Sequence, residues 1–248
     1  MRPQRFPLDQ RIALSYIGAC ALLLGCPGSV PPLVPLPLAP VPWDSGVGWA
    51  VATVPARHTL IRFRWKYRDA GKSYAGRAAA RVAPPDSLRI DYAGPFNWGA
   101  GAALVVGDTT VWADPEKNFR SLVPAVRMLW AGLGIVRPPA VGAAVFGLVG
   151  GGPGGPGGPG ADSVRIWRFV QGEDTLDYRL ARGGTRVLEA EWRRQGKVVA
   201  RSRAELDIRA MPASARIDFP EGPARFEFTV GAVDTTVVFD SATWRRRG

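Results

Sequence analysis

The chain has 248 residues, of which 46% are hydrophobic, so it is long enough to bury a core of its own. Its formal net charge is +11, but only four of its 32 basic residues are lysines, and the arginines are spread along the chain apart from the short tail at positions 245–247. Phosphate recognition in nucleic acids needs a compact basic patch or stripe, so this pattern argues against a nucleic-acid partner. Weak attraction to anionic lipid headgroups fits the pattern better.

Residues 1–25 have the organisation of a bacterial signal peptide. Three arginines, Arg2, Arg5 and Arg11, precede an uncharged apolar run that extends from Ile12 to Gly25. This run is shorter than the roughly 20 residues that a membrane-spanning helix needs, and prolines follow it at once. We therefore expect a cleaved leader and not a permanent transmembrane anchor.

The leader ends in a pattern that resembles the bacterial lipobox, in which a cysteine after aliphatic and small residues receives diacylglycerol. Residues 23–26 read Leu-Leu-Gly-Cys and fit this pattern, as do residues 17–20, Ile-Gly-Ala-Cys. We favour Cys26, because cleavage at Cys20 would leave a very short apolar run and expose three leucines on the mature protein. The alternative is a plain secretory signal with two incidental cysteines. No cysteine follows Cys26, so the mature chain has no internal disulfide.

A proline-rich stretch separates the leader from the rest of the chain. Seven of the sixteen residues 27–42 are prolines, which favours extended polyproline II structure and excludes a helix. We expect residues 26–42 to be a lipid-bearing tether, and residues 43–248 to be a single domain. The segment from Trp43 to Val54 is compatible with either a frayed helix or a strand.

From Thr59 the chain alternates between apolar and polar residues, as half-buried strands do. In the first run, aromatic and aliphatic residues alternate with cations: Ile61, Arg62, Phe63, Arg64, Trp65, Lys66, Tyr67 and Arg68. The same alternation recurs within residues 88–92, 176–180, 188–192, 198–208 and 224–230, and turn residues lie between these runs. The pattern predicts about ten antiparallel strands in meander order.

Two segments interrupt the strand pattern. Pro124 opens and Gly134 closes a segment in which apolar residues recur at helical spacing, which predicts an amphipathic helix. The apolar stretch of residues 140–149 is compatible with a second short helix. The Gly-Gly-Pro repeats of residues 150–160 predict a flexible loop, and they lack the Gly-Lys-Ser/Thr ending of a phosphate-binding loop.

Residues 76–115 carry a series of motifs in a characteristic order. Pro84-Pro85 precedes a strand with leucine, arginine, an apolar residue, aspartate and tyrosine at 88–92, and residues 104–115 follow with an apolar strand, a Gly-Asp hairpin, Trp112 and an Asp-Pro exit. This series resembles the core of the lipoprotein-carrier family of LolA and LolB. The resemblance implies a mainly β (α+β) fold, an unclosed antiparallel β-barrel of about ten to eleven strands with a short helical lid over an apolar cavity. The glycine-rich insertion departs from the family pattern.

The resemblance also implies a role in lipid or lipoprotein trafficking in the cell envelope. The family's carrier is soluble, whereas a lipobox with a tether is similar to its receptor, an outer-membrane lipoprotein. Acyl chains of lipids or lipoproteins are then the expected cargo, the membrane is bound through the N-terminal lipid on the periplasmic side, and a periplasmic carrier is a candidate partner. The alternative is a structural or assembly lipoprotein of the envelope without lipid cargo.

The residues offer little for catalysis. His58 is the only histidine and no cysteine follows Cys26, so we predict no enzyme activity, metal or cofactor, and a structural role for His58. Glu189 and Glu191 alternate with apolar residues on one strand face, which we interpret as a solvated face. The residues expected to line the apolar cavity are Phe63, Trp65, Leu88, Ile90, Leu104, Val106, Trp112, Val126, Leu129, Trp130 and Leu133. Ordinary core packing would give the same pattern.

Overall fold

The structure is a computed structural model in which residues 33–34, 37–94, 99–116, 125–139, 142–150, 163–182, 185–222 and 224–246 are described. The leader, with Cys20 and Cys26, lies outside these residues, and so do residues 151–160 of the glycine-rich segment. All described residues belong to one compact unit, which begins at Pro32.

Thirteen strands, two α-helices and a short 3₁₀ helix make up the regular structure of the described residues. In chain order they are β1 (Ala39–Pro40), α1 (Trp43–Val51), β2 (Thr59–Asp69), β3 (Lys72–Ala83), β4 (Ser87–Ala93), β5 (Gly101–Val106), β6 (Thr109–Asp114), α2 (Val126–Gly132), β7 (Ala144–Gly150), β8 (Ser163–Gln171), β9 (Asp174–Arg182), β10 (Arg186–Arg194), β11 (Lys197–Leu206), β12 (Pro212–Phe219), β13 (Ala224–Asp234) and η4 (Ser241–Trp244).

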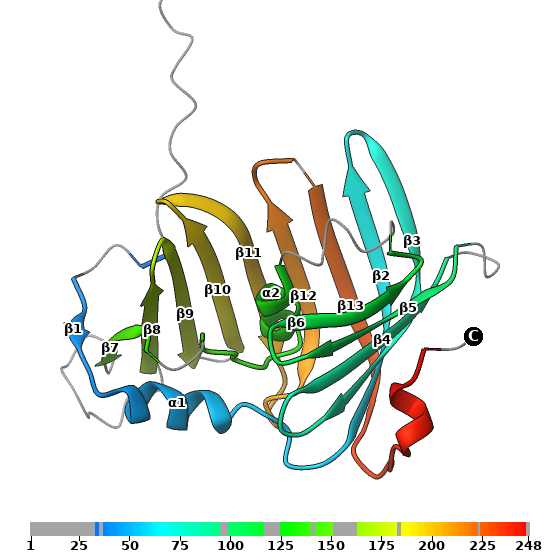
Figure 1. The fold of residues 1–248 in the computed structure, drawn as a ribbon, viewed down its shortest axis with the longest axis horizontal. Coiled ribbons are helices and arrows are strands. Elements are labelled where there is room, and N and C mark those ends of the chain that lie inside the picture. The colour runs from blue at the N-terminus through cyan, green and yellow to red at the C-terminus, as the bar shows by residue number, and fades with distance from the viewer. Residues whose placement is uncertain are drawn as a thin grey trace, which may run out of the picture. The chain divides into compact units, whose positions relative to one another are not determined.

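The strands form one antiparallel sheet in the order β1-β7-β8-β9-β10-β11-β12-β13-β2-β3-β4-β5-β6 (Figure 1). Two meanders, β7 to β13 and β2 to β6, join where β13 pairs with β2. The edge strands β1 and β6 are not neighbours, so the sheet stays open. This confirms the predicted unclosed antiparallel barrel with a short helical lid, although the described strands exceed the predicted ten to eleven.

Strand β7 occupies most of the apolar stretch of residues 140–149, which the sequence pattern left compatible with a short helix. Ala143, Val145 and Gly147 are buried while the residues between them are more exposed, which is the two-residue period of a strand. Gly147 permits close packing here, because a Cβ atom at this position would lie 2.8 Å from the Trp167 ring. A short apolar run fits a buried strand or a buried helix equally well, so the sequence left the choice open.

The proline-rich segment also joins the sheet. β1 pairs with β7 through Ala39 and Gly147, and Val34, farther upstream, is only 2% exposed. Packing against the sheet therefore begins several residues before Trp43, the position at which the sequence suggested that the domain starts.

Both helices lie on the inner face of the sheet. In α1, Trp49 stacks on Trp167 of β8 with ring centroids 5.9 Å apart. The predicted helix of residues 124–134 is observed as α2, which packs mainly on β10, β11 and β12. Its last helical residue is Gly132, and Gly134 closes the segment as predicted, because its φ of +80° lets the Ile135 N–H donate to the Trp130 carbonyl.

Candidate functional site

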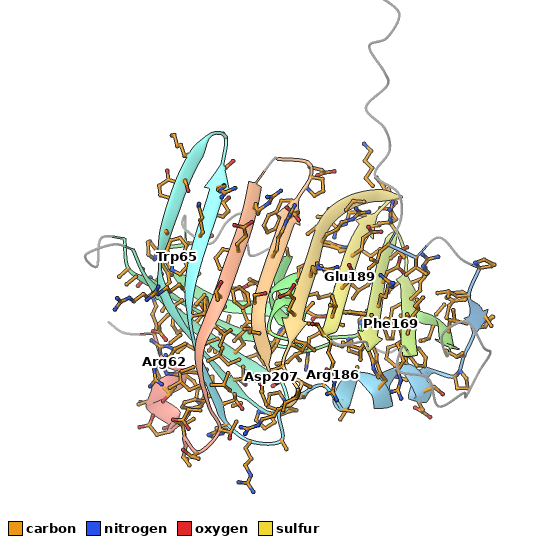
Figure 2. The ribbon with its side chains drawn as sticks, turned by 180° about the vertical axis from the view of Figure 1, so that it is seen from behind. Arg62, Trp65, Phe169, Arg186, Glu189 and Asp207 are labelled. Atoms are coloured by element: carbon orange, nitrogen blue, oxygen red, sulfur yellow. The ribbon has the colours of Figure 1, made fainter. Side chains whose placement is uncertain are left out.

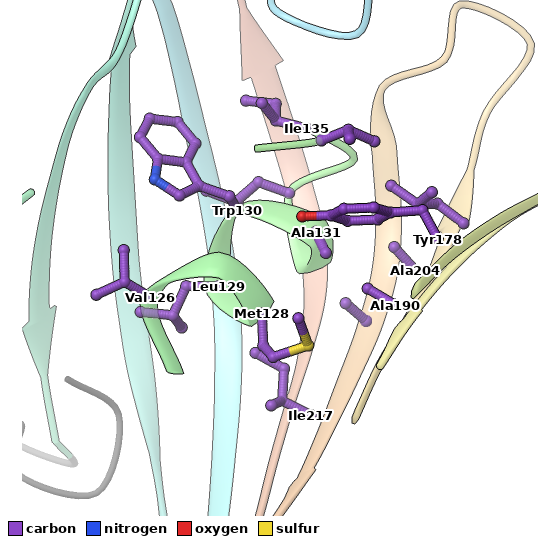
Figure 3. Packing of buried hydrophobic residues seen from close by; sticks show 14 of the residues in the cluster. Val126, Met128, Leu129, Trp130, Ala131, Ile135, Tyr178, Ala190, Ala204 and Ile217 are labelled. Carbon is purple, nitrogen blue, oxygen red and sulfur yellow. The ribbon is translucent and has the colours of Figure 1, made fainter. Parts of the chain in front are cut away.

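Helix α2 fills the inner face of the sheet over β10, β11 and β12 (Figure 3). Met128 and Ala131 are fully buried, and the small side chains of Ala190 and Ala204 let the helix approach the strands closely. Four predicted cavity residues on or beside α2 are each at most 8% exposed: Val126, Leu129, Trp130 and Leu133. This part of the inner face is therefore a packed core.

Polar contacts tie α2 to the other end of the sheet. The Trp130 indole N–H donates to the carbonyl of Gly107, in the β5–β6 turn, at 2.8 Å. Arg127 forms an ion pair with Asp108 of the same turn, also at 2.8 Å. The helix thus bridges β10–β12 and the β5–β6 hairpin, so it holds the barrel together from inside.

Tyr178 of β9 fixes the segment that follows α2. Its hydroxyl donates to the Arg137 carbonyl at 2.8 Å and accepts from the Arg137 N–H at 3.3 Å. Burial raises the pKa of this phenol, so the hydroxyl stays protonated and remains a donor. The chain leaving α2 is held to the sheet by this pair of bonds.

A second part of the inner face, on β13, β2 and β4, carries half-buried aromatic side chains. Trp65 stacks on Phe226 with centroids 6.4 Å apart and meets Tyr92 edge-on at 5.9 Å. Phe226 also contacts Phe228 at 5.9 Å, which continues the cluster into the buried core. We call Trp65, Tyr92 and Phe226 the aromatic strip. All three are partly exposed, whereas the residues around α2 are buried.

Two glycines make room for the aromatic strip. A Cβ atom at Gly76, opposite Trp65, would lie 2.8 Å from the indole ring and 2.1 Å from the Ala93 carbonyl. A Cβ atom at Gly101 would lie 2.6 Å from the Tyr92 ring. The rings therefore lie across positions without side chains. The Trp65 indole N–H donates to the Arg77 carbonyl at 3.1 Å, so its hydrogen bond is made within the protein.

The structure divides the predicted cavity residues between the two faces of the sheet. Phe63, Trp65, Leu88 and Ile90 lie on the inner face with α2. The partner of Leu88 across the β4–β5 pair is Val105, so the neighbours of Val105 in β5 point outward. The predicted residues that lie on the outer face are Leu104, Val106 and Trp112. Ala103, Leu104 and Val105 are all buried, so no alternation marked the inner face in this strand.

The C-terminal segment explains why the outer face is apolar there. Arg89 is 2% exposed, lies over the Trp112 ring at 5.3 Å, and donates to the carbonyls of Thr243 at 2.6 Å and Arg245 at 3.0 Å. The Trp112 indole N–H donates to the Trp244 carbonyl at 3.3 Å. The predicted role of Trp112 in an inner cavity is therefore wrong, because this residue anchors the C-terminal segment.

His58 also attaches the C-terminal segment to the rest of the domain. Its Nδ1 accepts the Phe239 N–H at 2.9 Å, and its ring stacks on Phe239 with centroids 5.0 Å apart. These contacts give the histidine the structural role that the sequence suggested. Across the described ranges, no three His, Cys, Asp or Glu side chains are grouped as metal ligands would be.

A buried charge cluster lies on the outer face of β8 to β11. Glu191 is fully buried, which corrects the predicted solvated face. It accepts from Arg193 Nε at 2.6 Å and forms an ion pair with Arg201. Asp177, its partner across the β9–β10 pair, is also fully buried and accepts from Arg168 Nε at 2.7 Å.

The end of the proline-rich segment covers these carboxylates. The Leu33 N–H donates to Glu191 Oε1 at 3.3 Å, and Arg168 Nη2 donates to the Val34 carbonyl at 3.1 Å. We call Leu33 and Val34 the strap. Since the strap is more than 130 positions from the strands it covers, the local sequence of β10 gave no sign that Glu191 is buried.

Comparison with known proteins supports the fold. No family model and no curated protein matches the sequence. A domain from Vibrio parahaemolyticus described as an outer-membrane lipoprotein-sorting protein matches with a TM-score of 0.50 and 10% identity, over 80% of this chain and 94% of that chain. This likeness shows the fold and confirms the predicted unclosed antiparallel β-barrel.

Two further solved structures match with lower scores. A DUF1329 family protein from Desulfovibrio piger has a TM-score of 0.44 and 10% identity, over 84% of this chain and 98% of that chain. A LolA superfamily protein from Nitrosomonas europaea has a TM-score of 0.44 and 11% identity, over 83% of this chain and 98% of that chain.

Within the described residues, none of the helices has the length and hydropathy to cross a bilayer.

Proposed function

We propose that this protein is a lipid-anchored lipoprotein of the cell envelope that shelters acyl chains of lipids or lipoproteins on the inner face of its open barrel. The observation that carries the proposal is the aromatic strip. Its three side chains stay partly exposed on an inner face whose other part is filled by α1 and α2. A partly exposed apolar surface of this kind favours a nonpolar ligand.

The chemistry of the strip suits an acyl chain. The flat rings of Trp65 and Phe226 can make dispersion contacts with an acyl chain. The Trp65 indole N–H already donates a hydrogen bond within the protein, so a ligand needs no acceptor for it. Burial contributes about 0.8 kcal/mol for each methylene, so ten buried methylenes would contribute about 8 kcal/mol before the cost of ordering the chain. The proposed role is binding and transfer, without catalysis and without a cofactor or metal.

A lipid on Cys26 would keep this domain near the membrane. Leu33 of the strap lies seven positions after Cys26, and such a chain spans at most about 25 Å when extended. This short reach would keep the domain beside the leaflet that holds the lipid. The location that we propose is the periplasmic side of the outer membrane, with cargo delivered by a periplasmic carrier.

Acyl-chain binding is tested by native mass spectrometry of the chain from residue 27, with a palmitoylated lipopeptide as the probe. The unaltered chain should form a complex, and Phe226→Glu should weaken it at least tenfold, because a carboxylate would enter the strip. Thr229→Glu is the matched control, since Thr229 is exposed on the outer face of the same strand and should leave binding unchanged. No uptake by the unaltered chain would reject the carrier role in favour of a structural or assembly lipoprotein.

Lipid attachment is tested by labelling cells with a fatty-acid analogue. The protein should carry the label, and Cys26→Ser should abolish it, because the thiol that accepts diacylglycerol is removed. Cys20→Ser serves as the control and should keep the label. Labelling that survives in Cys26→Ser and disappears in Cys20→Ser would move the attachment to Cys20, and labelling that survives in both would reject the anchor.

A further inference from the structure

The outer face of β2 and β3 carries a row of exposed cations. Arg64, Lys66 and Arg68 are exposed at alternate positions of β2, and Arg77 of β3 is the cross-strand partner of Arg64. We call these four residues the cationic stripe. With a strand rise of about 3.3 Å per residue, successive cations of β2 stand about 7 Å apart on one side of the sheet.

Among the described residues, the cationic stripe lacks the ion pairs that arginines form elsewhere on the outer face. On β8 to β13 several arginines of the outer face form ion pairs with carboxylates, five of them across neighbouring strands (Arg168–Asp177, Arg179–Glu189, Arg201–Glu191, Arg203–Glu189 and Arg225–Asp218) and one within β12 (Arg216–Asp218). Within the described part of the chain, the side chains of the stripe form no ion pair or hydrogen bond. Arg64 and Arg77 even stand directly opposite each other, an arrangement that destabilises a sheet.

We propose that the cationic stripe binds the phosphate headgroups of an anionic bilayer. An open sheet face presents its cations toward a surface rather than into a groove, which suits a membrane. The outer face also holds the strap, since Leu33 and Val34 contact Glu191 and Arg168 there. Figure 2 views the sheet from its outer side, and Glu189 of β10 and Arg62 of β2 are both labelled there.

The strap relates the cationic stripe to the lipid anchor of the proposed function. The orientation of the outer face toward the membrane rests on that anchor. Leu33 of the strap lies on the outer face, and the chain from there to Cys26 spans at most about 25 Å, so a lipid on Cys26 would keep that face close to the leaflet. Near a charged leaflet each basic residue strengthens binding about fivefold, and added salt screens the attraction. The four cations together would therefore strengthen binding several hundredfold.

The test measures binding of the chain from residue 27, which carries no acyl anchor, to vesicles of phosphatidylcholine with one third phosphatidylglycerol. Binding should be present at low salt, fall with added salt, and be absent on pure phosphatidylcholine. A variant with Arg64→Gln, Lys66→Gln, Arg68→Gln and Arg77→Gln should bind several hundredfold more weakly. Its thermal midpoint should be equal to or slightly above that of the unaltered chain, because the altered side chains are exposed and unpaired and the repulsion between Arg64 and Arg77 is removed.

The matched control removes four paired arginines from the same face: Arg179→Gln, Arg203→Gln, Arg216→Gln and Arg225→Gln. This variant has the same net charge and should keep most of the binding. Equal losses in both variants would show that net charge alone acts and would overturn the proposal. Binding to duplex DNA without binding to the vesicles would overturn it in favour of a nucleic acid.

The same preparations separate this inference from the proposed function. The stripe lies on the outer face, so its variant should take up the palmitoylated lipopeptide as the unaltered chain does. Vesicle binding without lipopeptide uptake would leave the stripe supported and reject the acyl carrier. Lipopeptide uptake without vesicle binding would support the acyl carrier and reject the membrane role of the stripe.

Discussion

Glu191→Ala is expected to lower the free energy of unfolding by about 3–5 kcal/mol. The carboxylate is fully buried and bonded to Arg193, Arg201 and the Leu33 N–H. Its removal takes a buried negative charge away from two arginines and frees one attachment of the strap. The loss should lower the thermal midpoint by roughly 6–20 °C, and urea unfolding provides the free energy.

Glu189→Ala is the matched control on the same face of the same strand. Glu189 also pairs with two arginines, Arg179 and Arg203, but their side chains are 41% and 55% exposed. Solvent screens these pairs, so the loss should be about 1 kcal/mol or less. If the two variants lost the same free energy, burial of Glu191 beneath the strap would not be the source of its contribution.

Trp130→Ala is expected to cost a similar amount, about 3–5 kcal/mol in the free energy of unfolding. Trp130 is 1% exposed at the centre of α2, and its indole N–H holds the β5–β6 turn through Gly107. Truncation leaves a cavity that rigid strands on both sides cannot fill. Urea unfolding followed by circular dichroism measures the loss.

Two further variants separate the contributions at this position. Trp130→Phe keeps most of the buried ring but leaves the Gly107 carbonyl without its donor, so we expect a loss of about 1–3 kcal/mol. Trp65→Ala removes a half-buried tryptophan from the aromatic strip and should cost less than half of the Trp130→Ala loss. Equal costs for Trp65→Ala and Trp130→Ala would contradict the division of the inner face into a packed part and a half-exposed part.

This division bears directly on function. Sequence reasoning expected one cavity lined by strands and helix together, but the helix residues of that set form the core. The half-exposed apolar surface is carried by β13, β2 and β4, and two of its three members, Tyr92 and Phe226, were not among the expected residues. The alternation around Tyr92 and Phe226 was visible in the sequence, but alternation shows which side chains share a face and not which of them a helix covers.

The sequence alone determined the local elements of this protein. Period-two alternation in residues 59–68 placed Phe63 and Trp65 on one face and the cations on the other, as β2 shows, and helical spacing with Gly134 at the end predicted α2. These patterns arise from the geometry of a single strand or helix, so a short window of residues contains them.

Only the tertiary structure decided which faces are covered. Leu104 and Trp112 point outward, Trp112 is held by the C-terminal segment, Glu191 is buried by the strap, and residues 144–150 form a strand because β1 and β8 pair with them. The segments that cover these faces are 132 to 158 positions away for Trp112 and Glu191. The burial of a strand face depends on such distant partners, and the period of the strand's own residues does not record them.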